Sequence, residues 1–142
     1  HTNDAPTSIS RLRNMGVEPF LLTASLNAVV AQRLVRKICS ECRRPEELSH
    51  QVLIDLQVPE DKIGSFEASR GAGCHACFNT GYKGRIAAYE VMVCGEELKE
   101  MILAGNSTQE LRREAIRLGM RTLRQSAINH LMTGKKLNAK DW

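Results

Sequence analysis

Five cysteines carry the clearest chemical signal in this sequence of 142 residues. Four of them form two C-x2-C motifs separated by 31 residues, and the fifth, Cys94, stands apart. A C-x2-C turn directs two thiolates toward one ion, and two such turns supply the four sulfurs of a closed tetrahedral zinc site. The sequence therefore predicts one structural Zn2+ ion per chain. The predicted metal ligands are Cys39, Cys42, Cys74 and Cys77.

The spacing of the two motifs leaves alternatives open. It exceeds the usual zinc-ribbon spacing of about 15–20 residues, although the entropy of closing a loop grows only logarithmically with its length. Two disulfides or two thioredoxin-like redox pairs could use the same cysteines. Zinc is favoured because redox C-x2-C motifs rarely occur as matched pairs, and because glycines surround the second motif, as expected where backbone turns tightly around a metal. These glycines are Gly71, Gly73, Gly81 and Gly84.

Two further residues could adjoin the metal site. His75 lies inside the second motif and could replace a sulfur. Because four cysteines are already available, we expect His75 outside the ligand set, either beside the ligands or exposed. Cys94 follows an apolar run and is expected to be a small core residue, since free cysteine is often buried. Bound zinc together with free thiols indicates a reducing compartment.

Composition bounds the class of protein. The chain is 42% apolar with a formal net charge of +4, which predicts one ordinary domain, or a domain plus a small module, and excludes intrinsic disorder. No stretch is apolar enough for a membrane-spanning helix. Charge is uneven, with a net +4 over residues 1–45, −6 over 46–110 and +6 over 111–142. The abrupt start at His1, without an initiator Met, suggests a piece of a longer protein.

Residue patterns predict mostly helices, with a short sheet beside the metal. Asp4 caps a helix that Gly16 ends, and Glu18-Pro19 starts another whose apolar positions continue at helical spacing to Leu34, beyond which 34–38 could be extended. Ser107 and Glu110 form a capping box, as Thr122 and Gln125 do for a later helix. The remaining expected elements are a helix over 46–56, a strand over 85–93, helices over 96–104 and 108–118, and a last helix ending near Gly134. The predicted fold class is mainly α with a small β-containing tetracysteine zinc module.

Several motifs, in order along the chain, resemble those of bacterial secretion ATPases. The block before the cysteines resembles the end of the motor domain of the type II secretion ATPase (general secretion pathway protein E) and the type IV pilus assembly ATPase. In that family the block runs into a tetracysteine module, as it does here. The matching segments are His1 to Thr7, Arg11-Leu12, Met15 to Phe20, Ser25 to Arg36, the four cysteines, Gly81 to Arg85 and Tyr89 to Val91.

The resemblance implies the C-terminal lobe of a RecA-like α/β secretion ATPase. It implies an end of the motor domain over 1–38, a zinc module over 39–94 and a C-terminal helical segment over 95–142. The parent would be a cytoplasmic homo-hexamer peripheral to the inner membrane, docked on inner-membrane assembly or platform proteins, and using ATP and Mg2+. The resemblance also implies that His1 belongs to the family's histidine box, near the nucleotide phosphates.

The chain also departs from the family pattern. It contains no G-x4-G-K-[ST] phosphate loop and no acidic Mg2+-binding motif before His1, so we expect no catalysis by this chain alone. The segment Lys135 to Trp142 lacks the acidic Glu-Glu-Val ending of the family. A rival interpretation is a free-standing zinc ribbon that binds nucleic acid, supported by the basic last third of the chain. A thiol oxidoreductase or chaperone is a third possibility.

Overall fold

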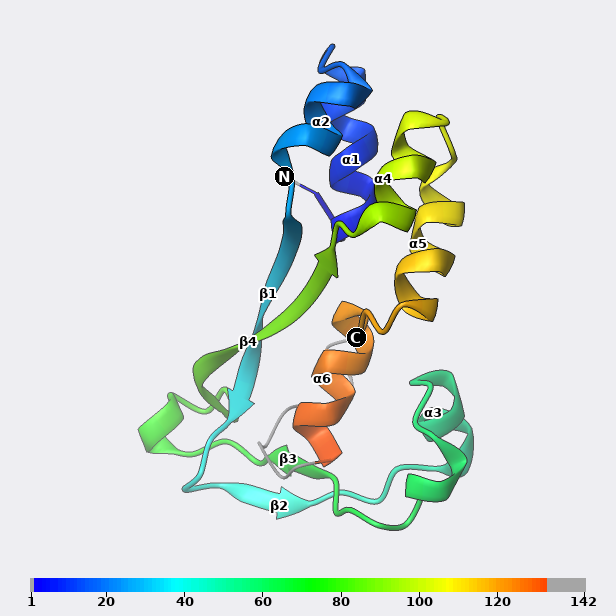
Figure 1. The fold of residues 1–142 in the computed structure, drawn as a ribbon. Coiled ribbons are helices and arrows are strands. Elements are labelled where there is room, and N and C mark those ends of the chain that lie inside the picture. The colour runs from blue at the N-terminus through cyan, green and yellow to red at the C-terminus, as the bar shows by residue number, and fades with distance from the viewer. Residues whose placement is uncertain (1, 133–142) are drawn as a thin grey trace. The chain divides into compact units, whose positions relative to one another are not determined.

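The computed structural model describes residues 2–132 (Figure 1). The chain divides into two compact units. The first unit comprises residues 1–32 and 89–123, and the second comprises residues 33–88 and 124–142. Each unit therefore combines two separate stretches of the sequence.

Two long strands form a two-stranded sheet, β1 (Ala28–Ile38) and β4 (Tyr82–Val93). The two strands are antiparallel, because a backbone hydrogen bond at each end of the pair joins the residue that follows one strand to the residue that precedes the other. These bonds run from the Cys94 N–H to the Asn27 carbonyl and from the Cys39 N–H to the Gly81 carbonyl, both at 2.9 Å.

The long β1 strand corrects the sequence-based expectation of a helix running from Pro19 toward Leu34. Helix α2 (Pro19–Ser25) ends before the strand begins at Ala28. The strand is rich in β-branched valines, which favour extended backbone, and β4 supplies the ladder partner that a helix would not need. The apolar spacing of three and four residues was therefore misleading, and the fold is a small α/β fold rather than mainly α.

The first unit is a helical cluster packed on the ends of these strands. Its helices are α1 (Ala5–Asn14), α2, α4 (Glu96–Leu103) and α5 (Thr108–Arg117). Helix α1 packs against α5, α2 against α4, and α4 against α5. The largest fully buried apolar side chains of this unit form its core: Ile9, Met92, Leu98, Ile102 and Leu111.

Two expected helix starts of the first unit are confirmed. The Asp4 carboxylate accepts a hydrogen bond from the Thr7 N–H at 2.8 Å and caps α1. The capping box at α5 is present, because the Ser107 hydroxyl accepts from the Glu110 N–H at 3.3 Å while the Glu110 carboxylate accepts from the Ser107 N–H at 2.8 Å. Both motifs involve residues three apart, so the sequence alone specifies them.

The second unit contains a short strand pair and its own apolar cluster. Strands β2 (Arg43–Pro45) and β3 (Ser69–Gly71) are antiparallel, with Arg44 opposite Arg70. Helix α3 (His50–Asp55) begins after Ser49, so the helix expected over 46–56 is shorter than predicted. Two 3-10 turns are η1 (Glu60–Lys62) and η2 (His75–Cys77), and the last helix is α6 (Leu123–Met132). The buried cluster comprises Leu53, Leu56, Val58, Ile128 and Leu131.

Within residues 2–132, no helix has the length and apolar character needed to cross a bilayer. The expected end of the last helix, near Gly134, lies outside the described residues, as does His1.

Candidate metal centre

The structure brings together the four cysteines of the two C-x2-C motifs. Their sulfur atoms all lie within 4.8 Å of one another. Four sulfurs placed 2.3 Å from the centre of a tetrahedron are about 3.8 Å apart, and three of the pairs match that spacing. The matching distances are 3.9 Å for Cys39 and Cys74, 3.8 Å for Cys42 and Cys77, and 3.7 Å for Cys74 and Cys77. The cluster could therefore hold one metal ion.

All five cysteines are free thiols in this structure. The spacing of the clustered sulfurs is nearly twice the disulfide bond length of about 2.0 Å. The two-disulfide arrangement considered from the sequence is therefore not adopted here.

Strand ends position the two motifs. Cys39 directly follows β1 and Cys42 directly precedes β2, while Cys74 and Cys77 lie at the two ends of turn η2, which follows β3. Backbone hydrogen bonds join the loops, because the Ala72 N–H donates to the Cys42 carbonyl at 2.9 Å and the Cys39 N–H donates to the Gly81 carbonyl. Residues far apart in sequence thus converge on one place in the second unit.

Glycine allows the backbones beside the cluster to approach closely. A Cβ atom on Gly71 would lie 2.0 Å from the Gly81 carbonyl oxygen, and one on Gly81 would lie 2.7 Å from the Gly71 carbonyl oxygen. Gly81 also has a φ of +77°, in the left-handed region that favours glycine. This close approach explains why glycines occupy positions 71 and 81 beside the second motif.

Backbone N–H groups point at two of the sulfurs. The Gly73 N–H donates to the Cys42 sulfur at 3.3 Å, and the N–H groups of Cys74 and Gly81 each donate to the Cys77 sulfur at 3.2 Å. Donors of this kind stabilise negative charge on sulfur and orient a thiolate ligand.

These donors act unequally on the thiol pKa values. Burial opposes ionisation of Cys77, but its two backbone donors outweigh burial and lower the pKa of Cys77 to about 6. Burial outweighs the single donor at Cys42 and raises the pKa of Cys42 to about 11. Because the thiolate is the form that binds metal, the lowered pKa of Cys77 favours a metal-binding form of this side chain near neutral pH.

The other candidate residues lie outside the sulfur cluster. His75 is exposed within turn η2, and the group of ligating atoms found among the described residues contains no histidine. Cys94 belongs to the first unit and is 5% exposed, and burial raises the pKa of its thiol. Its expected place in a core is confirmed.

Sequence reasoning assigned no role to Glu90, which the structure places at the start of two helices. The side chain is 1% exposed. Its two carboxylate oxygens accept hydrogen bonds from the Ala5 N–H at 2.8 Å and the Leu123 N–H at 3.1 Å, at the first residues of α1 and α6. A lone acidic residue in the middle of an apolar strand was the available signal, because a buried carboxylate requires partners.

Comparison with known proteins places the chain among secretion and pilus proteins. The family described as type II/IV secretion system protein matches residues 1–139. The type IV pilus assembly ATPase PilB of Myxococcus xanthus is 53% identical over 135 residues, covering 94% of this chain and 24% of the relative.

Two further relatives show the same pattern. PilB of Thermus thermophilus is 41% identical over 134 residues, covering 94% of this chain and 15% of that protein. The type II secretion system protein HxcR of Pseudomonas aeruginosa is 40% identical over 134 residues, covering 94% and 24%. The chain thus spans about a quarter of the length of these relatives, or less. Since the matching region extends over nearly the whole sequence, the chain belongs to the type II/IV secretion system protein family.

Proposed function

We propose that this chain is the C-terminal part of a cytoplasmic, hexameric ATPase that powers type II secretion or type IV pilus assembly. The observation that carries the proposal is the family match over residues 1–139, together with relatives named as pilus assembly and secretion proteins. In this proposal residues 1–38 end a RecA-like motor domain, 39–94 form a zinc module and 95–142 form a helical segment.

Zinc in this proposal is structural. The residues that would hold it are Cys39, Cys42, Cys74 and Cys77, whose sulfurs already lie at distances suited to a tetrahedral ion. Four thiolates leave no position for water or substrate, so the ion would tie the loop after β1 to the loop after β3 and would not take part in hydrolysis. Structural zinc of this kind contributes directly to folding free energy.

The catalytic parts of the ATPase lie elsewhere in the parent protein. The phosphate loop and the acidic Mg2+ ligands would come from sequence outside this chain, and His1 would contribute one hydrogen-bond donor near the phosphates. Docking on inner-membrane platform proteins, and a location at the cytoplasmic face of that membrane, follow from the same proposal.

A comparison of the complete protein with this chain alone tests the proposal. The complete protein should hydrolyse ATP, while the chain alone should show no turnover. Changing His1→Ala in the complete protein should slow turnover by roughly 10- to 1,000-fold, the range expected for one positioned donor. ATP affinity should fall far less, because the phosphate loop makes most of the ground-state contacts.

Zinc is tested separately. Elemental analysis of protein purified without chelators should find one zinc per chain, and Cys39→Ser should remove it. Full activity in the His1→Ala enzyme, or hydrolysis by the chain alone, would overturn the assignment of the motor. A mass corresponding to two disulfides and no zinc would overturn the metal assignment.

A further inference from the structure

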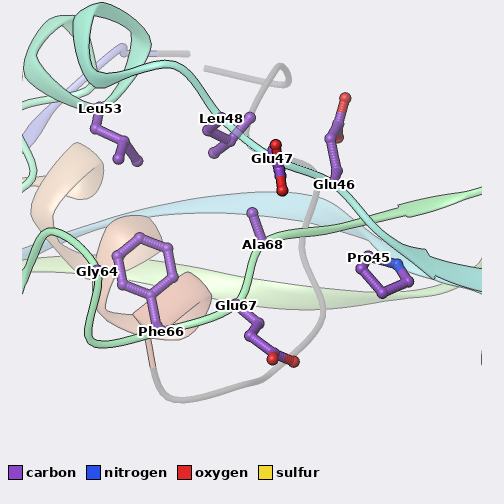
Figure 2. Close-up of a pocket in the computed structure, with 9 residues that line it drawn as sticks. All are labelled: Pro45, Glu46, Glu47, Leu48, Leu53, Gly64, Phe66, Glu67 and Ala68. Carbon is purple, nitrogen blue, oxygen red and sulfur yellow. The ribbon is translucent and has the colours of Figure 1, made fainter.

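A cavity of about 440 Å³ opens in the second unit, where two segments of the chain diverge beyond the β2–β3 strand pair. A backbone hydrogen bond from the Glu46 N–H to the Ala68 carbonyl, at 3.0 Å, extends that pair by one step. Past this bond, segments 46–48 and 66–68 form two walls of the cavity, and Leu53 of α3 contributes to a third (Figure 2). We call this cavity the acidic groove, for the charge described below.

The apolar walls of the acidic groove are part of a packed core. Figure 2 shows the side chains of Leu48, Leu53 and Phe66 directed toward the space between them. Leu53 belongs to the buried cluster of this unit, and Leu48 and Phe66 pack against that cluster. Because core contacts hold these side chains in place, the groove is already formed before a ligand binds, which lowers the entropy cost of binding.

Charge at the rim of the groove is of one sign. Glu46, Glu47 and Glu67 line the groove, and within residues 2–132 no lysine or arginine does so. The Glu47 carboxylate points into the opening, whereas that of Glu67 points away (Figure 2). Among the ion pairs of the described residues, none involves Glu47 or Glu67. Glu47 is also exposed, so its carboxylate is accessible to a cation on a binding partner.

The charge of the surrounding chain limits the length of a suitable ligand. Segment 46–67 contains six acidic residues and one lysine, Lys62, whose Nζ lies 3.5 Å from the Asp61 carboxylate. Along the strand pair the sign reverses, because Arg44 lies opposite Arg70. A short cationic segment therefore complements the groove, whereas a long cationic segment would also meet these arginines.

We propose that the acidic groove binds a short basic segment of a partner protein, in which lysine or arginine residues flank a large apolar side chain. The apolar side chain would lie against Leu53 and Phe66, and a neighbouring cation would face Glu47. The cavity volume of about 440 Å³ falls within the range of roughly 300–1,000 Å³ that is usual for ligand sites. This inference concerns the second unit alone and does not depend on the proposed ATPase activity.

The two kinds of contact respond differently to solution conditions. Attraction between exposed charges weakens as salt is added, so the affinity for the basic segment should fall with ionic strength. Burial of an apolar side chain gives a negative heat-capacity change on binding. Calorimetric titrations at several temperatures and salt concentrations should therefore show both effects.

Fluorescence anisotropy tests the proposal with the complete chain and a fluorescein-labelled peptide of sequence Lys-Lys-Phe-Leu-Lys-Lys. One control peptide, Lys-Lys-Ser-Ser-Lys-Lys, keeps the charge and lacks the apolar side chains. The other, Glu-Glu-Phe-Leu-Glu-Glu, keeps the apolar side chains and reverses the charge. The first peptide should bind more tightly than either control by roughly 10-fold or more, because only it can make both kinds of contact.

Charge variants test the role of Glu47. Glu47→Lys should weaken binding of the basic peptide by roughly 3- to 30-fold and should strengthen binding of the acidic control peptide. Glu60→Lys alters the net charge equally at an exposed glutamate that does not line the groove, and it should leave both affinities nearly unchanged. Circular dichroism and metal content confirm that each variant remains folded.

A filling variant tests the cavity itself. Ala68 lines the groove and faces its opening (Figure 2), so Ala68→Leu adds volume there without changing the charge. This variant should weaken binding of Lys-Lys-Phe-Leu-Lys-Lys and leave that of Lys-Lys-Ser-Ser-Lys-Lys unchanged. Ala104→Leu, at an exposed alanine of the first unit, is the matched control and should affect neither peptide.

Three outcomes would overturn the proposal. The first is equal affinity for the basic peptide and its two controls. The second is an equal effect of Glu47→Lys and Glu60→Lys, or of Ala68→Leu and Ala104→Leu, which would place peptide binding elsewhere on the chain. The third is self-association that Glu47→Lys abolishes and that the basic peptide competes away, which would show that the groove binds a second copy of this chain.

Discussion

Glu90 is a buried acidic residue whose carboxylate is hydrogen-bonded to the backbone. Its carboxylate is 1% exposed, yet both oxygens accept backbone hydrogen bonds, from Ala5 and Leu123. The first N–H groups of a helix lack partners within the helix and carry the positive end of its dipole. The Glu90 side chain therefore stabilises the starts of α1 and α6, and the N-terminal ends of these two helices compensate its buried negative charge.

Removing the Glu90 carboxylate should destabilise the protein strongly. Glu90→Ala would leave two buried N–H groups without an acceptor, and we expect a loss of about 2–5 kcal/mol in the free energy of unfolding. Glu90→Gln keeps one acceptor oxygen and should lose less. Urea unfolding measures both, with Glu100→Ala on the exposed side of α4 as a control that should stay within about 0.5 kcal/mol. Equal stability of all three variants would show that water can replace the carboxylate.

Cys94 should be separable from the sulfur cluster. Cys94→Ala removes little volume from the core of the first unit, and we expect a loss of only about 1–2 kcal/mol. Metal content should be unchanged, because the Cys94 sulfur is not in the cluster. Elemental analysis beside Cys39→Ser makes the comparison. Loss of metal from the Cys94 variant would add this residue to the ligand set and reopen the role of His75.

The sequence allowed the cysteine cluster to be predicted but gave no indication of the role of Glu90. The cysteine cluster could be predicted because each C-x2-C pair is local and because thiolates that bind one ion must converge. Glu90 could not, since its partners lie 85 and 33 residues away in sequence. Only the three-dimensional contact between strand β4 and the two helix starts distinguishes it from an ordinary glutamate.

At the scale of elements, short-range signals were reliable and long-range pairing was not. The cap of α1 and the capping box of α5 involve residues three apart and were correctly predicted. The helix expected to continue toward Leu34 was wrong, because the alternative conformation depends on β4, which lies far along the chain. Strand formation in β1 thus depends on tertiary pairing with β4 as well as on the local preference of its valines.

The cap of α1 should make stability depend on acidic pH. Burial opposes ionisation of Asp4, but hydrogen bonds from Thr7 and Arg112 outweigh it and lower the pKa of Asp4 below its ordinary value of 3.8. Stability from the ionised carboxylate is therefore fully present above pH 3.8 and is lost as pH falls through the lower, folded-state pKa. Asp4→Asn keeps a capping oxygen but removes the ion pair with Arg112, so its unfolding free energy should vary less over this acidic range. Identical pH profiles for the two proteins would contradict this assignment.

The loop contact between Gly71 and Gly81 should be intolerant of a side chain. Gly81→Ala places a Cβ 2.7 Å from the Gly71 carbonyl oxygen and holds alanine at positive φ, which costs roughly 1–3 kcal/mol in backbone strain before any displacement of the cysteines. Metal affinity, measured by competition with a chelator, should fall. Gly95→Ala is the control, because its Cβ meets only ordinary contact and its φ is negative. Unchanged affinity in Gly81→Ala would show that the loops can separate without disturbing the sulfurs.

At the scale of the whole molecule, the four cysteines belong to one compact unit and the large buried side chains of α1, α4 and α5 to the other. The core of the first unit contains none of the clustered sulfurs. Stability of the two units should therefore depend differently on metal.

Chelation should unfold the second unit selectively. Because zinc binding to such sites is worth on the order of 10–16 kcal/mol in peptides, its removal should expose the amides of β2, β3 and α3 to hydrogen exchange. The amides of α1, α4 and α5 should keep much of their protection. Hydrogen exchange followed by mass spectrometry, with and without chelator, measures both sets. Simultaneous loss of all protection would show that the chain unfolds as a single cooperative unit.

The position of Glu90 along the chain also has a consequence for synthesis on the ribosome. At roughly 5–20 residues per second, the 85 residues that separate Ala5 from Glu90 are added over about 4–17 seconds. During that time the nascent α1 has no buried carboxylate at its start, and its apolar face has neither β4 nor α5 to cover it. The 33 residues from Glu90 to Leu123 require a further 2–7 seconds, approximately, at the same rate. Among the elements of residues 2–132, helix α1 is therefore the one whose partners are synthesised after the longest delay.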